Sequence, residues 1–193
     1  MAAFHPGRGR RAYGRSTSIG WLEGHDDDPN DDATLRRVKV YQPILDALAA
    51  RLGSSLKTIV LFGSQARGDA TPESDHDFLV VASDLPLSVV DRQRLLRRYL
   101  IPVAAQPPGT IAFVARTPDE LRANLSPLLV DVCADGHCLV GAEYFEPLRA
   151  RALAAITQSG LQRRRVGGTL MWVFPQPHLH NWRLDWDGFH DRV

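Results

Sequence analysis

The sequence contains little of what secreted and membrane proteins depend on. Its 193 residues include two cysteines, too few for a disulfide framework. No apolar run approaches the roughly 20 residues that a helix needs to cross a bilayer, and no apolar stretch follows the N-terminal arginines as in a secretory signal. These absences favour a cytoplasmic protein without a membrane segment.

An excess of charge of either sign is also lacking. Lysine and arginine together number 23 and the acids 22, for a net charge of +1. This balance excludes a polyanion or a strongly basic coat protein. Hydrophobic residues make up 44% and charged residues 23%, which is typical of a globular domain rather than a disordered chain.

Composition divides the chain into three parts. Residues 1–33 carry a cluster of aspartates and few apolar side chains, so we predict a disordered tail there. Residues 34–142 hold the apolar segments of a folded domain. For residues 143–193 we predict a helix to about Gln162, followed by an irregular or strand-like extension rich in arginine and aromatic residues.

Short apolar runs alternate with segments of helical spacing in the folded part. Strands are predicted at residues 58–62, 77–81, 110–115 and 137–140. Helices are predicted at residues 32–52, 87–101 and 117–136, the last with Thr117 as its N-cap. In the second helix we expect Val90 to face the core and Arg92 the solvent. This alternation is typical of a small α/β or α+β domain.

Two aspartates at the start of a predicted strand carry the clearest chemical signal. Because side chains alternate along a strand, Asp75 and Asp77 are expected on one face, with His76 and Phe78 on the other. Two adjacent carboxylates repel each other and need a counter-ion, and Mg²⁺ takes carboxylate and phosphate oxygens together. Such a pair can bridge two metal ions in phosphoryl transfer.

A glycine and a serine follow the preceding strand directly. Gly63 has no Cβ, so a phosphate can approach its backbone, and the Ser64 hydroxyl with the following amides can hold an anion. Arg67, one turn further on, either clamps a phosphate or braces the loop by pairing with Asp69 or Glu73. Each fragment alone is compatible with an ordinary exposed loop, but the joint pattern favours a nucleotide-handling site.

The whole window resembles the signature of the DNA polymerase beta-type nucleotidyltransferase superfamily. It is most similar to the small bacterial minimal nucleotidyltransferases, an antitoxin-like branch, and the resemblance covers residues 35–141. The matching positions are Gly63, Ser64, Arg67, Gly68, Ser74, Asp75 and Asp77. The resemblance implies the nucleotidyltransferase fold, an α/β (α+β) fold with a small mixed β-sheet and helices packed mainly on one face.

The resemblance also implies a reaction. Gly63 and Ser64 would hold the phosphates of an NTP, ATP in the first place, with Arg67 assisting. Asp75 and Asp77 would be the catalytic residues and the ligands of Mg²⁺. A nucleoside monophosphate would pass to a hydroxyl of a protein, an RNA or a small molecule, with release of pyrophosphate.

One departure from the family pattern opens an alternative. The family usually places a third carboxylate on the next strand, and residues 110–115 contain no acid. Asp131 is the nearest later candidate, but we predict it to be helical and out of register. The alternative is a catalytically degenerate nucleotidyltransferase, an antitoxin or binding protein that neutralises a toxin by contact.

The C-terminal part carries a weaker pattern. No acid lies between Pro147 and Arg183, and arginines there are interleaved with aromatic residues. This composition suits RNA, through phosphate contacts and base stacking. We favour the simpler interpretation, a solvated helix face followed by a tail that packs its tryptophans on the core. His178 and His180, with His190, form a weak candidate for a transition-metal site.

Overall fold

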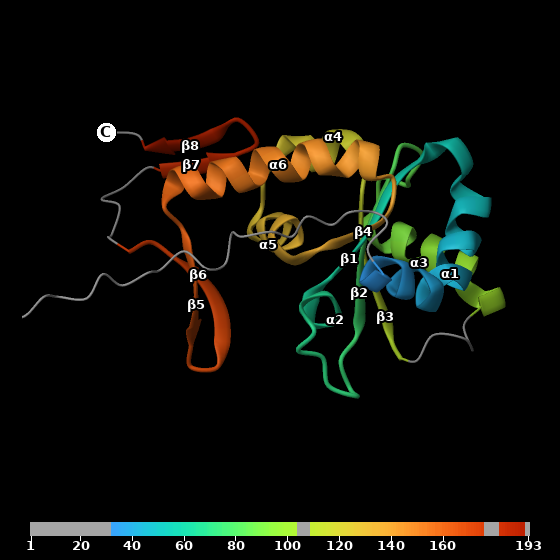
Figure 1. Ribbon diagram of the computed structural model, residues 1–193. Coiled ribbons are helices and arrows are strands. Elements are labelled where there is room, and N and C mark those ends of the chain that lie inside the picture. The colour runs from blue at the N-terminus through green and yellow to red at the C-terminus, as the bar shows by residue number, and fades with distance from the viewer. Residues whose placement is uncertain (1–31, 104–108, 176–181, 192–193) are drawn as a thin grey trace, which may run out of the picture.

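The computed structural model describes residues 32–103, 109–175 and 182–191. They form a four-stranded sheet, helices on both of its faces, and two C-terminal β-hairpins (Figure 1). The predicted disordered tail lies outside the described residues up to position 31, and the first helix begins at Asp32. In the described ranges, no helix is both long and apolar enough to cross a membrane.

The sheet is mixed, as expected, and consists of the four predicted strands. Their bounds are β1 (Leu56–Phe62), β2 (His76–Ala82), β3 (Ile111–Arg116) and β4 (His137–Val140). The order is β3-β2-β1-β4, with β1 antiparallel to both β2 and β4, and β2 parallel to β3. Because Phe62 pairs with Asp77, the end of β1 lies beside the start of β2.

Two helices cover one face of this sheet. They are α1 (Asp32–Leu52), which continues through Pro43, and α3 (Val89–Leu100). Their apolar side chains pack on Ile59, Phe78 and other residues of the central strands. Short 3₁₀ turns follow both helices, at Gly53–Ser55 and Ile101–Val103.

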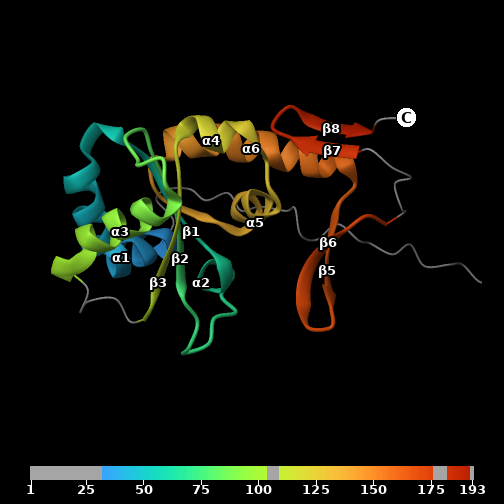
Figure 2. The same ribbon diagram turned by 180° about the vertical axis from the view of Figure 1, so that it is seen from behind.

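Three helices cover the opposite face. They are α4 (Pro118–Ala123), α5 (Pro127–Asp135) and α6 (Ala142–Ser159). Val60 and Leu79 are buried beneath them. Figure 2 shows α1 and α3 on one side of the sheet and these three helices on the other.

The fold class is therefore confirmed, with helices shared more evenly between the faces than expected. The cause lies in the central strands, where consecutive residues such as Ile59 and Val60 are both 0% exposed. A strand that is apolar on both sides must be covered on both sides.

The single helix predicted for residues 117–136 is wrong, because the segment forms α4 and α5. The chain breaks between them at Asn124 and begins again with Ser126, whose side chain accepts a hydrogen bond from Leu129 N, and with a proline at the first helical position. The predicted start is confirmed, since Thr117 and Glu120 form a capping box.

The predicted orientation of Arg92 is also wrong. Its side chain is 1% exposed, whereas that of Val90 lies on the surface. Arg92 donates two hydrogen bonds to Glu120, Nη1 to Oε2 at 2.6 Å and Nη2 to Oε1 at 2.8 Å, and another to the Ala115 carbonyl. A guanidinium satisfied in this way can be buried at an otherwise apolar position.

The C-terminal extension is strand-like. Hairpin β5–β6 pairs Gln162–Val166 with Thr169–Val173, and a second hairpin pairs β7 (Trp182–Asp185) with β8 (Gly188–Asp191). The first turn uses Gly167 and Gly168, both with positive φ, as two-residue hairpin turns prefer. The second hairpin lies along α6 (Figure 1).

Candidate functional site

The site begins where β1 passes into the short helix α2 (Gly63–Arg67). Gly63 has φ +75°, and a Cβ at this position would lie 2.4 Å from Oδ2 of Asp77. Both the backbone angle and the close approach therefore require glycine. The turn brings the backbone at the start of α2 directly against a predicted catalytic carboxylate.

The alternation predicted for the two aspartates holds for Asp77. Asp77 is half-buried at the second position of β2. Its neighbours His76 and Phe78 are buried on the other face, beside Tyr41 of α1. The Tyr41 hydroxyl lies 2.8 Å from Nδ1 of His76. Burial lowers the pKa of His76, which favours a neutral imidazole in this pair. Asp75 is exposed and directly precedes the strand.

The charges of the two carboxylates act on each other. Burial and the neighbouring Asp75 raise the pKa of Asp77 above its usual 3.8, while Arg67 and His76 act in the opposite direction. Among the residues that the structure describes, neither carboxylate forms a hydrogen bond or an ion pair. The pair thus concentrates negative charge that Arg67 and His76 offset only in part.

The donor chemistry of this pair fits a hard divalent cation. Carboxylate oxygens are the ligands that Mg²⁺ takes, usually one or two from the protein with substrate phosphates and water completing the shell. The described part of the chain contains no group of three or more His, Cys, Asp or Glu residues able to hold a metal ion. A metal on Asp75 and Asp77 would therefore depend on oxygens from substrate and solvent.

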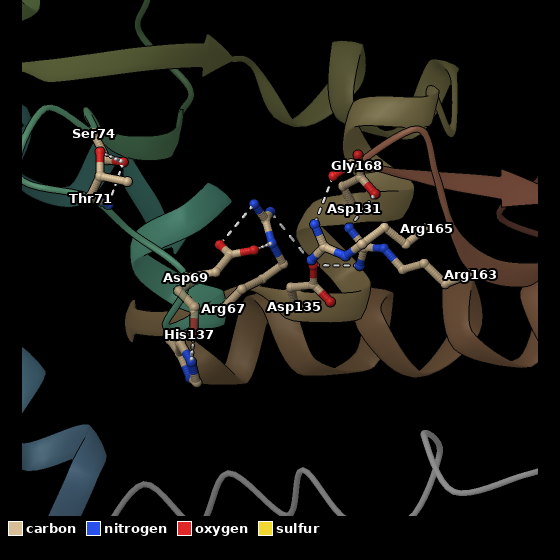
Figure 3. Close-up of polar contacts among 11 residues, drawn as sticks. Arg67, Asp69, Thr71, Ser74, Asp131, Asp135, His137, Arg163, Arg165 and Gly168 are labelled. Carbon is tan, nitrogen blue, oxygen red and sulfur yellow. Dashed lines mark hydrogen bonds and ion pairs between the residues drawn. The ribbon is translucent and has the colours of Figure 1, made fainter.

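Helix α2 ends in a tight turn at Gly68. The Ser64 carbonyl accepts hydrogen bonds from Gly68 N at 2.9 Å and Asp69 N at 3.1 Å, and Gly68 takes a left-handed conformation with φ +78°. Ser64 itself lies in the first turn of α2, half-buried. Further along, Thr71 N donates to the Ser74 hydroxyl at 2.9 Å and closes the loop before Asp75 (Figure 3).

Arg67 braces the loop by pairing with Asp69, one of the two roles predicted for it. Its guanidinium pairs with Asp69, Nη2 to Oδ1 at 3.2 Å, and lies 3.9 Å from Oδ2 of Asp135, a residue of α5 (Figure 3). No pairing with Glu73 is formed in the described structure. The pairing with Asp69 is partly exposed, so it leaves the guanidinium accessible to another anion.

Comparisons with known proteins point the same way as this geometry. A family model described as a nucleotidyltransferase domain matches residues 43–107. "Putative protein adenylyltransferase MJ0604" of Methanocaldococcus jannaschii is 37% identical over 68 residues, which are 35% of this chain and 68% of that protein. The chain belongs to the nucleotidyltransferase family.

Two further similarities are more partial. "Putative protein adenylyltransferase MJ1305" of the same organism is 34% identical over 92 residues, which cover 48% of this chain and 53% of that protein, so the match spans about half the relative's length. A crystal structure described as a toxin-antitoxin with AMP-PNP aligns with 62% of this chain and 88% of its own, at 23% identity and a TM-score of 0.44.

The family match contains Gly63, Ser64, Arg67, Asp75 and Asp77 and stops before β3. On that strand of this nucleotidyltransferase-family chain, Ala112 pairs in register with Asp77. The residue of β3 beside Asp77 is therefore an alanine, which cannot supply the third carboxylate that the family usually places on this strand.

Asp131 does not replace the absent acid. It lies on α5, as predicted, and accepts a hydrogen bond from Trp172 Nε1 at 2.8 Å and an ion pair from Arg163 Nη2 at 3.1 Å. Both partners come from hairpin β5–β6. This aspartate therefore anchors the hairpin.

The described residues give no support to the transition-metal site suggested by the three C-terminal histidines. His178 and His180 lie outside them, and Nε2 of His190 is 3.2 Å from Oδ1 of Asp185, its neighbour across the second hairpin. Sequence reasoning also missed three residues near the site, Tyr41, Asp135 and Arg163. Tertiary packing brings these residues to the site, and no pattern of spacing in the sequence indicates them.

Proposed function

We propose that the chain is a Mg²⁺-dependent nucleotidyltransferase that moves a nucleoside monophosphate, from ATP in the first place, to a hydroxyl of a protein. The observation that carries this proposal is the unbalanced pair Asp75 and Asp77 beside the tight Gly63 turn. The names of the two relatives, both protein adenylyltransferases, support AMP as the group and protein as the acceptor.

The proposed roles follow from the positions of the side chains. Asp75 and Asp77 would hold Mg²⁺, which when bound neutralises charge on the phosphates. Ser64 and Arg67 would bind the triphosphate and orient its α-phosphorus toward the acceptor. The acceptor oxygen forms a bond to that phosphorus, the bond to the oxygen bridging to the β-phosphate breaks, pyrophosphate leaves, and the hydroxyl proton passes to water.

The experiment is transfer of label from α-³²P-ATP with Mg²⁺. Host lysate protein, total tRNA and small aminoglycosides serve as separate acceptors. Asp75→Asn and Asp77→Asn should each lower transfer at least about 100-fold, because each removes a proposed metal ligand. Asp119→Asn, which changes a fully exposed acid on α4, is the matched control and should match the unmodified chain. Undiminished transfer by either site variant would overturn the assignment.

A second candidate function follows from Ala112. Without a carboxylate beside Asp77, the chain would bind nucleotide and metal but turn over poorly, and would act as a binding protein such as an antitoxin. On this reading Ala112→Asp should raise transfer about 100-fold, the lower end of the usual range for general-base catalysis. Substantial transfer by the unmodified chain, with no gain in Ala112→Asp, would exclude this second candidate.

A further inference from the structure

Hairpin β5–β6 is fastened to α5 by a charged cluster close to the candidate site. Arg163 donates to Asp135 through Nη1 and pairs with Asp131 through Nη2 at 3.1 Å. Its guanidinium also lies over the Trp172 ring, 5.2 Å from the centroid. The side chains of Arg163 and Asp135 are each only 19% exposed, so this ion pair is weakly screened by solvent.

One oxygen of this cluster is shared with the nucleotide site. Oδ2 of Asp135 accepts the hydrogen bond from Arg163, and the same atom is 3.9 Å from Nη1 of Arg67, too far for a hydrogen bond (Figure 3). A single carboxylate therefore lies between two guanidinium groups, one from the hairpin and one from α2. It is bonded to the first and only near the second.

The position of Asp135 between Arg163 and Arg67 affects how strongly Arg67 can attract a phosphate. Because Arg163 balances Asp135, the close ion-pair partner of Arg67 within the described residues is the exposed Asp69, and exposed pairs are weak. If Arg163 were absent, the mostly buried Asp135 would keep Arg67, 3.9 Å from its Oδ2, as an ion-pair partner. Attraction in a poorly screened position would then draw Arg67 toward α5 and away from a bound nucleotide.

We propose that Arg163 and Asp135 are positioning residues for nucleotide binding, and that Arg163 keeps Arg67 available by occupying Asp135. This inference rests on the proposed function, since it assumes that Arg67 contacts the nucleotide. It assigns hairpin β5–β6, which lies outside the matched family region of residues 43–107, a part in the nucleotide site.

The test measures binding of a fluorescent ATP analogue to the full chain with Mg²⁺ present. Arg163→Ala should raise the dissociation constant about 3- to 10-fold, the usual size of such indirect coupling. Asp135→Asn should bind at least as tightly as the unmodified chain, because Arg67 loses its competing anion. The double variant, Arg163→Ala with Asp135→Asn, should return to within about twofold of the unmodified chain.

Arg164→Ala is the matched control. Arg164 is the next residue of the hairpin, exposed, and bonded to Gln162 of its own strand. Its loss removes the same charge without touching Asp135, so binding should not change. Thermal unfolding of every variant reports whether the hairpin change has destabilised the fold.

The double variant separates positioning from a merely structural role. If Arg163 only fastens the hairpin, removing Asp135 as well cannot repair the damage, and equal weakness of the single and double variants would overturn the inference. Unchanged binding by Arg163→Ala would overturn it too. Failure of the unmodified chain to bind the analogue at all would overturn the proposed function and this inference together.

Discussion

Two carboxylates on the same side of the sheet are treated in opposite ways. Glu120 at the start of α4 is held by the buried Arg92, and the hydrogen bonds from Arg92 lower its pKa from the usual 4.5 to about 2. Asp77 at the start of β2 has its pKa raised by burial and by Asp75. The first charge is balanced within the fold, whereas for the second we propose that a divalent cation from outside balances it.

This difference separates a structural acid from the acid that we propose to be functional. A balanced ion pair needs no ligand, and removing it should damage the fold rather than the chemistry. An unbalanced pair costs stability in the free protein, and this is typical of binding and catalytic sites. The two regions should therefore respond in opposite ways to mutation and to pH.

The largest effect on the structural side is expected from Arg92→Ala. The change removes a side chain that is 1% exposed and leaves the Ala115 carbonyl without this donor, so we expect a loss of about 3 kcal/mol in the free energy of unfolding. Urea denaturation measures it. Arg94→Ala, on the exposed side of the same helix, is the control and should change stability by about 0.5 kcal/mol at most. Equal effects of the two variants would contradict the account.

A smaller loss of stability with a large loss of function is expected from Gly63→Ala. The positive φ costs an alanine about 1–2 kcal/mol, and the new Cβ would collide with Oδ2 of Asp77 and displace it. Gly53→Ala is the matched control, because Gly53 also has positive φ and a Cβ there meets nothing within 4 Å. Both variants should lose similar stability, and only Gly63→Ala should lose label transfer. Full label transfer by Gly63→Ala would show that the Gly63 turn is not needed for the activity of the site.

The smallest effects, opposite in sign, are expected from pH. Because the folded pKa of Glu120 lies below its usual value, its contribution is complete above about pH 4.5 and is lost as pH falls toward 2. The folded pKa of Asp77 is raised, so its charge destabilises the fold once pH rises above that value. At neutral pH, Glu120→Gln should therefore be less stable than the unmodified chain and Asp77→Asn slightly more stable. Chemical denaturation between pH 3 and 7 measures the free energy of unfolding of both variants. If both variants were more stable, or both less stable, than the unmodified chain, the contrast between the two acids would be wrong.

Much of the sheet and of the site's first residues could be predicted from the sequence, for local reasons. An apolar run that ends before Gly63 predicted β1, and one that begins at Asp77 predicted β2, because a strand is recognised from a few consecutive residues. The alternation that leaves Asp77 half-buried and Phe78 fully buried follows from the geometry of any strand. The Thr117 cap likewise depends on only four consecutive residues.

The remainder depends on contacts between distant parts of the chain. Arg92 looked like a surface residue because its partner Glu120 lies 28 positions away. The arginine-rich strand β5 has no apolar alternation, and its pairing comes from the Gly167-Gly168 turn. Asp135 and Arg163 meet Arg67 only after α5 and the hairpin have packed, so local patterns do not reveal them.

The central claim is that Asp75 and Asp77 are unbalanced because they bind a divalent cation together with a nucleotide. Its most direct test is titration with Mn²⁺, followed by electron paramagnetic resonance, in the presence of a non-hydrolysable ATP analogue. The unmodified chain and Glu120→Gln should bind the ion, and the double variant Asp75→Asn with Asp77→Asn should not. Mn²⁺ binding that is undiminished in the double variant would contradict the account.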